Sequence, residues 1–176
     1  GASPNWTVLL GGGTFNVVSQ RAVPSQIGAI SPGGFYAYSI DNDRTRVTVQ
    51  VRITGATFGV ATFGTFTLIA RSQAPNSVAN TYACGSNTQT FQLLRVVSST
   101  STVLAGGGTV PLSNGDQYQV QFTLEGSHLR CEISGDYNLS LSAFDSTYSS
   151  GYYAMGGGKN AVTEMTFDDY MIEVQD

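Results

Sequence analysis

Strict alternation of apolar and polar residues around a short turn is the feature that most constrains this chain. Residues 118–135 read YQVQFTLEGSHLRCEISG, where Val120, Phe122 and Leu124 alternate with polar residues up to the turn at Gly126. A period of two places every second side chain on the same face of a strand, and a tight polar turn joins two such strands. The pattern therefore predicts a β-hairpin with one buried face and one polar face.

The same alternation recurs along the rest of the chain. Residues 44–53 read RTRVTVQVRI, with Val47, Val49 and Val51 on one face. About a dozen short strands are predicted, separated by turn residues, which is typical of two packed antiparallel sheets. Three Gly-Gly-Gly runs, at 11–13, 106–108 and 156–158, are expected at loop tips. The predicted strands cover residues 6–10, 14–18, 35–40, 44–53, 64–71, 80–85, 90–97, 102–104, 117–124, 128–134, 139–144, 152–155 and 166–174.

The composition supports an all-β fold. Charged residues make up 11% of the 176 positions, less than half the usual share, and Lys159 is the only lysine. Long helices need Glu, Lys, Arg and Ala on their exposed faces, so this chain favours strands. Residues 1–3 resemble the remnant of an expression tag. We therefore expect residues 4–176 to form a single β-sandwich domain.

The charge balance argues against two classes of partner. The net charge is −4 and the eight basic residues are scattered. Nucleic acids and anionic membranes are bound through clustered Lys and Arg, so neither is expected as a partner. No apolar run approaches the roughly 18 residues of a membrane span, so membrane insertion is not expected. Low charge with abundant Ser, Thr and Gly suits an extracellular protein or a virion surface.

Two cysteines, Cys84 and Cys131, each fall inside a predicted strand. If they were bridged, the disulfide would close a loop of 47 residues and contribute roughly 4 kcal/mol in the chain-entropy model. We favour two buried free thiols and keep the bridge as the alternative. His128 does not complete a zinc site with the two cysteines, because the three residues lack the sequence spacing of zinc ligands.

The order of these motifs resembles a known superfamily. The strand at 44–53 is followed by FTLIAR at 66–71, FQLLR at 91–95, the central hairpin and the closing strand TFDDYMIEV at 166–174. This order resembles concanavalin A-like jelly rolls, which include laminin G-like domains, legume-type lectins and β-glucanases. The resemblance implies a jelly-roll sandwich that binds glycans or a surface. It also implies that the terminal strands pair, placing residues 6–10 beside 166–174.

The acidic residues do not fit the catalytic members of that superfamily. β-Glucanases place a Glu-x-Asp-x-x-Glu pattern on one strand, and this pattern does not occur here. Glu164, Asp168 and Asp169 come nearest, while Glu125 and Glu132 flank the central hairpin. The only histidine, His128, lies in a turn, without a Gly-x-Ser-x-Gly motif that would supply a nucleophile. A glycosidase is therefore a less favoured alternative, and we expect no enzyme.

Two acidic residues of the closing strand are candidates for a metal site. Asp168 and Asp169 are adjacent on a strand, so one of them is expected to point inward. An inward carboxylate must be paired, hydrogen-bonded or bound to a hard cation. The resemblance implies a structural calcium near the first and last strands. Pairing with an arginine or a turn hydrogen bond is the favoured alternative.

The candidate ligand-binding residues are aromatic and polar. Sugars stack on aromatic rings while polar side chains bind their hydroxyl groups. One candidate site is a Gly/Ser loop and the strand after it; the other is the polar face of a concave sheet. Burial in the core is the alternative for the aromatic residues. The loop site comprises Asp145, Tyr148, Tyr152 and Tyr153, and the sheet site comprises Arg71, Tyr82, Gln92 and Arg95.

The sequence thus predicts a non-catalytic module for recognition or attachment. Its expected partner is a glycan or another polymer on a cell or virion surface. The alternative is a structural decoration or fibre domain of a phage particle, without a sugar ligand, contacting other virion subunits or copies of itself.

Overall fold

The computed structural model describes residues 7–8, 15–18, 21–24, 33–40, 44–55, 66–74, 77–87, 90–110, 113, 115–157 and 163–174. The regular structure of these residues is entirely β. Their fourteen strands are β1 (Thr7–Val8), β2 (Phe15–Val18), β3 (Arg21–Pro24), β4 (Gly33–Ile40), β5 (Arg44–Gly55), β6 (Phe66–Ser72), β7 (Thr81–Asn87), β8 (Thr90–Val97), β9 (Thr100–Thr109), β10 (Gln117–Glu125), β11 (His128–Gly135), β12 (Leu139–Phe144), β13 (Gly151–Gly157) and β14 (Thr163–Val174).

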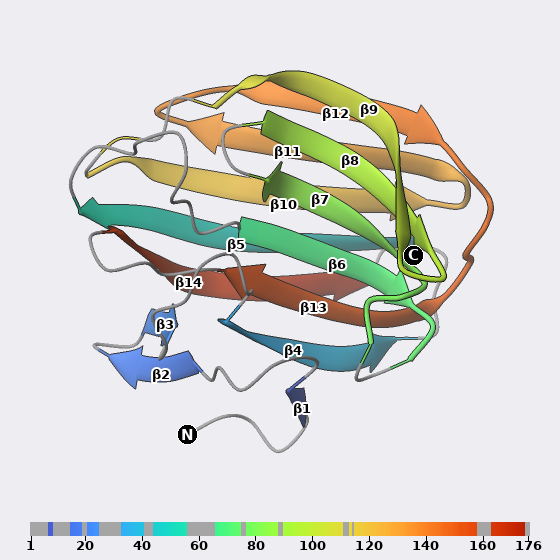
Figure 1. Ribbon diagram of the computed structural model, residues 1–176, viewed down its shortest axis with the longest axis horizontal. Helices are drawn as coiled ribbons and strands as arrows, with labels where there is room; N and C mark the ends of the chain where they lie inside the picture. Colours follow the sequence, from blue (N-terminus) through green and yellow to red (C-terminus); the bar gives the residue numbers. More distant parts are fainter. Residues whose placement is uncertain are drawn as a thin grey trace.

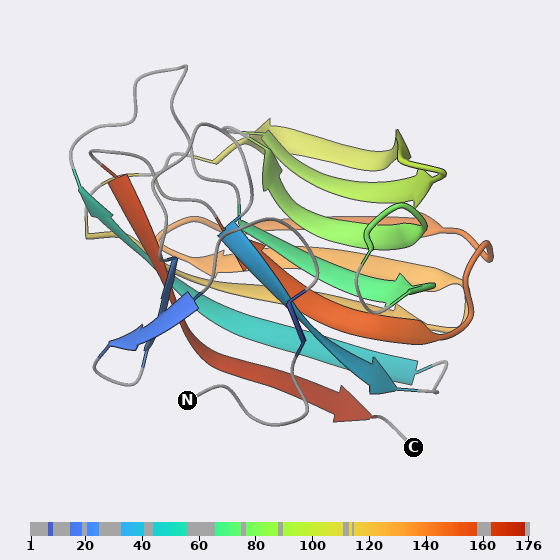
Figure 2. The ribbon, with the colours of Figure 1, turned by 60° about the horizontal axis from the view of Figure 1, so that its bottom comes forward.

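The strands form two antiparallel sheets that pack face to face (Figures 1 and 2). Sheet A has the order β1-β4-β13-β6-β7-β8-β9, and sheet B has the order β12-β11-β10-β5-β14-β3-β2. This arrangement is a jelly-roll β-sandwich, as the strand pattern predicted. The described residues contain no helix that is long and apolar enough to cross a membrane.

The core lies between the sheets and is built from the alternating positions. In β10, Val120, Phe122 and Leu124 are fully buried, and the exposed Gln119 and Glu125 lie on the opposite face. Sheet A supplies the matching layer, so each sheet has one apolar face packed against the other. The buried residues that sheet A contributes include Phe66, Leu68, Ala70, Tyr82, Cys84, Phe91, Leu93, Tyr153 and Met155.

A disulfide crosses this core. Cys84 of β7 and Cys131 of β11 are bonded, with their Cα atoms 5.5 Å apart. The expectation of two free thiols is therefore wrong. It failed because sequence spacing does not reveal that β7 and β11 face each other across the two sheets. The bond ties sheet A to sheet B at the centre of the sandwich.

The N-terminal strands are arranged differently from the expectation. Thr7 of β1 pairs with Ala37 of β4 in sheet A, so β1 does not lie beside the closing strand. That place in sheet B is taken by β3, where Ala22 pairs with Phe167 of β14. β2 pairs with β3 in sheet B, whereas β1 lies in sheet A. Strand β3 was missed because four residues ending in proline give no readable alternation.

Two of the three glycine runs are strand, not loop tips. Residues 106–108 lie inside β9, and Gly156 and Gly157 lie inside β13. A Cβ atom at Gly107 would lie only 2.4 Å from Leu139 Cδ2 of β12, so glycine lets the edges of the two sheets approach each other. The run at 11–13 and Gly158 lie outside the described residues, as do residues 1–3.

Candidate functional site

Five of the eight predicted ligand-binding residues gather at one end of the sandwich. Residues 145–150 connect β12 of sheet B to β13 of sheet A and cover this end (Figure 1). Gly151 ends the connection at a φ of +144°, where a side chain would collide with the backbone of Ser72. The connection brings together Arg71, Tyr82, Arg95, Asp145 and Tyr148.

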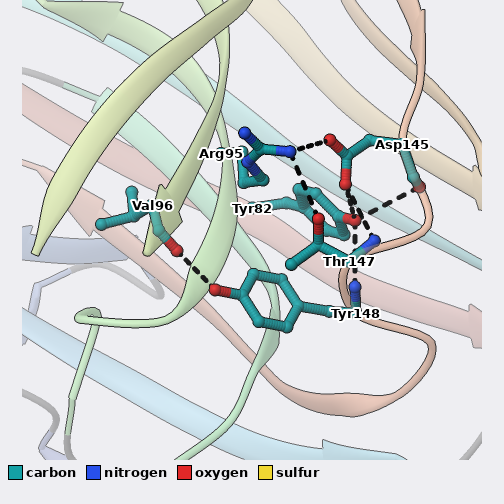
Figure 3. A network of polar contacts seen from close by, with 6 residues as sticks. All are labelled: Tyr82, Arg95, Val96, Asp145, Thr147 and Tyr148. Atoms are coloured by element: carbon teal, nitrogen blue, oxygen red, sulfur yellow. Dashed lines mark hydrogen bonds and ion pairs between the residues drawn. The ribbon is translucent and has the colours of Figure 1, made fainter. Parts of the chain in front are cut away.

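Asp145 is the centre of a polar network (Figure 3). The Tyr82 hydroxyl donates to Asp145 Oδ1 at 2.6 Å, and Arg95 Nη1 donates to Oδ2 at 2.6 Å. The backbone N–H of Thr147 also donates to Oδ1, at 2.9 Å. The Asp145 carboxylate therefore has partners on both oxygens, including a charged one.

The network shifts the pKa of both central groups. Burial is the largest influence on Asp145 and acts to raise the pKa, but hydrogen bonds from Thr147 and Tyr82 and the charge of Arg95 outweigh it. The pKa of Asp145 is therefore below its ordinary value. Burial first, and then the hydrogen bond to Asp145, raise the pKa of Tyr82 to about 12. The carboxylate and the neutral phenol are thus the forms that the fold stabilises.

Tyr148 and Arg71 also hold the 145–150 connection in place. The Tyr148 hydroxyl donates to the Val96 carbonyl at 2.7 Å, and the Tyr148 N–H donates to the Tyr82 hydroxyl at 3.1 Å. Arg71 Nη1 donates to the carbonyls of Gly126 and Tyr148, at 2.7 and 3.0 Å. Arg71 and Tyr82 are fully buried. These residues hold the end of the sandwich together, and their polar groups are turned toward the protein.

The other three predicted residues lie apart from this network. Tyr153 is fully buried in the core, where its hydroxyl accepts a hydrogen bond from Thr45 Oγ1 at 2.6 Å. A side chain with no exposed surface cannot contact a ligand in this structure, so burial, the stated alternative, describes Tyr153. Gln92 and Tyr152 alternate with buried residues of β8 and β13, which places them on the outer face of sheet A.

That outer face does not form the predicted polar surface. Ile69, Ala83 and Ala154 are buried on it and pack against Leu94 and Tyr152. The described part of the face is therefore apolar at its centre. The expected alignment of Arg71, Tyr82, Gln92 and Arg95 on one face is wrong. Arg71, Tyr82 and Arg95 contact the 145–150 connection instead. Tyr82 and Arg95 occupy inward positions of their strands, whereas Gln92 occupies an outward one.

The outer face of sheet B carries a groove that the sequence did not reveal. It has a volume of about 470 Å³ and crosses the hairpin β10–β11 and the edge strand β12. Its polar residues are two amides from β10, a carboxylate and a hydroxyl from β11, and an amide and a hydroxyl at β12. The lining consists of Gln119, Gln121, Glu132, Ile133, Ser134, Asn138, Leu139 and Ser140.

The strand register arranges the groove residues in rows. Gln121 lies opposite Glu132, and Glu132 lies opposite Ser140, so the three form one row across the strands. Gln121 Nε2 and Ser140 Oγ donate to the Glu132 carboxylate at 3.4 and 3.3 Å, which are long hydrogen bonds. Arg130 Nε lies 3.0 Å from Glu132 Oε2 and balances its charge. The groove is thus polar, close to neutral and only loosely bonded internally.

An exposed aromatic pair lies on the same face, at the other end of the same strands. Phe144 is 78% exposed, which is unusual for so large an apolar side chain. Its ring stacks on His128, with centroids 4.8 Å apart and planes at 22°. The two residues are cross-strand partners in β12 and β11. They form the last cross-strand row of this face, at the opposite end from the groove.

The hairpin acids do not form a pair. Glu125 lies opposite His128, whereas Glu132 lies opposite Gln121. His128, the partner of Glu125, lies four residues from Glu132 along β11. The rows of the two acids are therefore roughly 13 Å apart at the usual rise per residue. Paired carboxylates of glycosidases lie about 5 to 9.5 Å apart. Glu125 and Glu132, which flank the central hairpin, therefore do not face each other.

The predicted calcium site at Asp168 and Asp169 is not tested by the described residues and stays a prediction. Asp169 is exposed and lies at an irregularity of β14, between Asp168 and Met171, where its own φ is +48°. The side chain of Asp168, and that of Glu164, lie outside the described residues. Among the side chains that are described, no group of three acidic, His or Cys residues could hold a metal ion.

Solved structures share the fold across nearly the whole chain. The carbohydrate binding module CBM66 from Bacillus subtilis is 19% identical, with a TM-score of 0.68 and coverage of 96% of this chain and 95% of that one. The CBM2 module of the evolved Dit of Lactobacillus casei BL23 phage J-1 is 14% identical, with a TM-score of 0.72 and coverages of 98% and 90%. The exoplasmic/lumenal domain of VIP36, in a form bound to Ca²⁺ and Man, is 12% identical, with a TM-score of 0.67 and coverages of 99% and 91%.

These similarities show the fold, a lectin-like sandwich, and do not by themselves assign an activity. A carbohydrate esterase from the Shiga toxin-encoding bacteriophage phi24B also shares it, at 12% identity and a TM-score of 0.58, over 98% of this chain and 91% of that one. No protein-family model matches the sequence. No curated protein sequence matches it either.

Proposed function

We propose that this chain is a non-catalytic recognition module that binds glycans through the groove on the outer face of sheet B. The observation that carries the proposal is the groove itself, about 470 Å³ in volume and lined mainly by amides and hydroxyls around one carboxylate. Ligand sites combine a concave surface with a few convergent polar groups, and this groove has both properties.

The chemistry of the lining favours a neutral polyhydroxylated ligand. Sugar hydroxyls both donate and accept hydrogen bonds, and Gln, Asn, Ser and Glu side chains together supply both functions. Gln121 and Ser140 already point at Glu132, yet their bonds of 3.3 to 3.4 Å are long enough to be exchanged for shorter bonds to a ligand. The charge of Arg130 beside Glu132 leaves no strong net charge to attract an ionic ligand.

The similar structures support this class of function by analogy. Two of them are carbohydrate-binding modules and a third is bound to Man, and the CBM2 module belongs to a phage protein. We therefore propose attachment to a glycan or polymer of a cell surface, by a protein that lies outside the cell or on a virion. Other virion subunits, or further copies of this chain, would be its structural neighbours.

A glycan array followed by titration calorimetry tests the proposal. We expect saturable binding that Gln121→Ala weakens about tenfold, the effect of losing roughly one ligand hydrogen bond. Gln92→Ala is the matched control, because it removes the same amide from the outer face of sheet A. Loss of binding in Gln92→Ala but not in Gln121→Ala would move the site to sheet A.

Two alternatives give different results in the same experiment. A structural decoration or fibre domain would bind no glycan on the array and would form a defined oligomer. A glycosidase or esterase would turn over a polysaccharide, and substitution of Glu125, Glu132 or Glu164 would abolish the turnover.

A structural calcium is proposed separately, on the resemblance and on the Ca²⁺-bound form of VIP36. Asp168 and Asp169 are the residues of this chain that would contribute carboxylates. Thermal unfolding with added Ca²⁺ and then with excess chelator tests it. An unchanged Tm across both conditions would remove the metal from the proposal.

A further inference from the structure

We infer that Phe144 and His128 form a stacking subsite that extends the groove, and that the ligand is a linear, neutral glycan lying along β12. The inference rests on the proposed function, and it names the class of glycan and a second contact point. It is carried by the position of one exposed aromatic pair relative to the groove.

Phe144 is held as a platform and is not covered by other described residues. Its side chain is 78% exposed, while one side of its ring stacks on His128 at 4.8 Å. The cross-strand pairing of the two residues fixes the imidazole behind the ring, so the ring is pre-oriented before any ligand binds. A pre-oriented aromatic face buries the apolar C–H side of a sugar ring with little further loss of conformational freedom.

The Phe144 ring and the groove lie along the same strand, β12, and we call the line of outward side chains between them the track. Ser140, Ser142 and Phe144 alternate with inward residues of β12, so they share the outer face of sheet B. Ser140 lines the groove, and Phe144 lies four residues farther, roughly 13 Å along the strand. A single sugar ring is too short to contact both points. A chain of several sugars following β12 would contact the groove, the row of Arg130 and Ser142, and then the ring of Phe144.

The charges along this track favour a neutral chain. Arg130 is paired with Glu132 at 3.0 Å, and the exposed Glu125 lies opposite His128 at the aromatic end. An anionic glycan would meet two carboxylates and one arginine that is already paired. A neutral glycan meets hydroxyls and amides, and it loses no charge solvation when it binds.

The test uses wild-type protein and linear neutral oligosaccharides of one to six units from the cello, malto and manno series, titrated by calorimetry. In the series that binds, we expect affinity to rise with chain length in the wild type. We expect Phe144→Ala to bind the longest chains about tenfold more weakly, and the shortest binding chain unchanged, because only the stacking contact is lost.

Met171→Ala is the matched control. Met171 is also an exposed apolar residue of sheet B, at 48%, but it lies on β14, outside the groove. Both substitutions remove exposed side chains, so both should leave the Tm nearly unchanged. Sedimentation of all three proteins shows whether Phe144 instead contacts a second copy of the chain.

The outcomes separate this inference from the proposed function. If Gln121→Ala weakens binding while Phe144→Ala does not, the stacking subsite is overturned and the groove is kept. If no neutral series binds but the array shows an anionic glycan, the ligand class is overturned. If Phe144→Ala turns a dimer into a monomer without changing glycan affinity, Phe144 belongs to a subunit interface. An array with no binding at all overturns the proposed function itself.

Discussion

The end of the sandwich around Asp145 and the outer face of sheet B are both polar, but their polar groups are used in opposite ways. Around Asp145, two partners donate to the carboxylate at 2.6 Å and a third at 2.9 Å. On the outer face, the carboxylate of Glu132 receives bonds of 3.3 and 3.4 Å from its neighbours in the row. The polar groups around Asp145 are therefore bonded within the protein, whereas those around Glu132 remain available to a ligand.

This difference separates polar groups that stabilise the fold from polar groups that can bind a ligand. A buried polar group must find its partners inside the protein, because water is excluded and an unmade bond costs free energy. A polar group in an open groove keeps its capacity for a partner from outside. Clustering of Asp, Arg and Tyr is therefore a poor guide to a binding site unless the exposure of the cluster is known.

Removal of the disulfide should have the largest effect and should separate the two regions most clearly. Cys84 lies two residues from Tyr82 of the network, and Cys131 is the neighbour of Glu132 in the groove. We expect the double substitution Cys84→Ala, Cys131→Ala to lower the free energy of unfolding by roughly 4 kcal/mol. Urea unfolding measures this loss, and reduction of the wild type should reproduce it. Glycan affinity of the folded fraction should stay the same, and a parallel fall would mean that the regions are coupled.

Removal of the Asp145 carboxylate is the next strongest test. Asp145→Ala leaves the buried hydroxyl of Tyr82 and the guanidinium of Arg95 without their main partner, so we expect a loss of about 3 kcal/mol. Asp145→Asn serves as the control, because it keeps the shape and one acceptor oxygen. The expected result is a lower Tm with unchanged glycan binding. A loss of binding at full stability would instead place the ligand at this end of the sandwich.

Acidification should weaken the same region to a smaller extent. The pKa of Asp145 is lowered by the fold, so the unfolded chain takes up a proton before the native state does. Its contribution to stability is therefore complete above the ordinary Asp pKa of about 3.9 and is lost as the pH falls through the lower native value. Urea midpoints measured from pH 6 downward should fall less steeply in Asp145→Asn than in the wild type. The exposed Glu125→Gln should follow the wild-type slope, and equal slopes in all three would refute this role for Asp145.

Substitutions in the groove should have the smallest effect on stability. Gln121 and Ser140 make only long hydrogen bonds at the protein surface, so alanine at either position should change the free energy of unfolding by less than about 0.5 kcal/mol. Urea unfolding of the two variants, alongside Asp145→Ala, compares the regions directly. A loss of more than 1 kcal/mol, on the scale of a buried hydrogen bond, would show that the groove is also structural.

The fold could be predicted from the sequence wherever one face of a strand is buried. The pattern at 117–124 and 128–134 predicted β10 and β11 almost to the residue, because alternation records which side chains face the core. Strands 90–97 and 139–144 matched β8 and β12. Strand β9 was predicted only at 102–104, because its glycines read as a loop although they let the strand pass close to Leu139.

The candidate site could not be predicted in the same way. The groove depends on the register that places Gln121, Glu132 and Ser140 in one row, and three strands must be aligned before that row exists. One signal was present in the sequence. Phe144 stands at an alternate position whose neighbours on the same face, Ser140 and Ser142, are polar, so the alternation alone could have placed it on the exposed face.

The close approach of Gly107 to Leu139 has a consequence for the behaviour of the protein at high concentration. The outermost strand of a sheet is where β-proteins aggregate, because its free N–H and C=O groups can pair with another chain. β9 and β12 are the last strands of their sheets, and the missing side chain at Gly107 lets each shield the other's flank. A larger residue at this position would push the two edges apart and expose both, so we expect its first visible effect to be poor solubility.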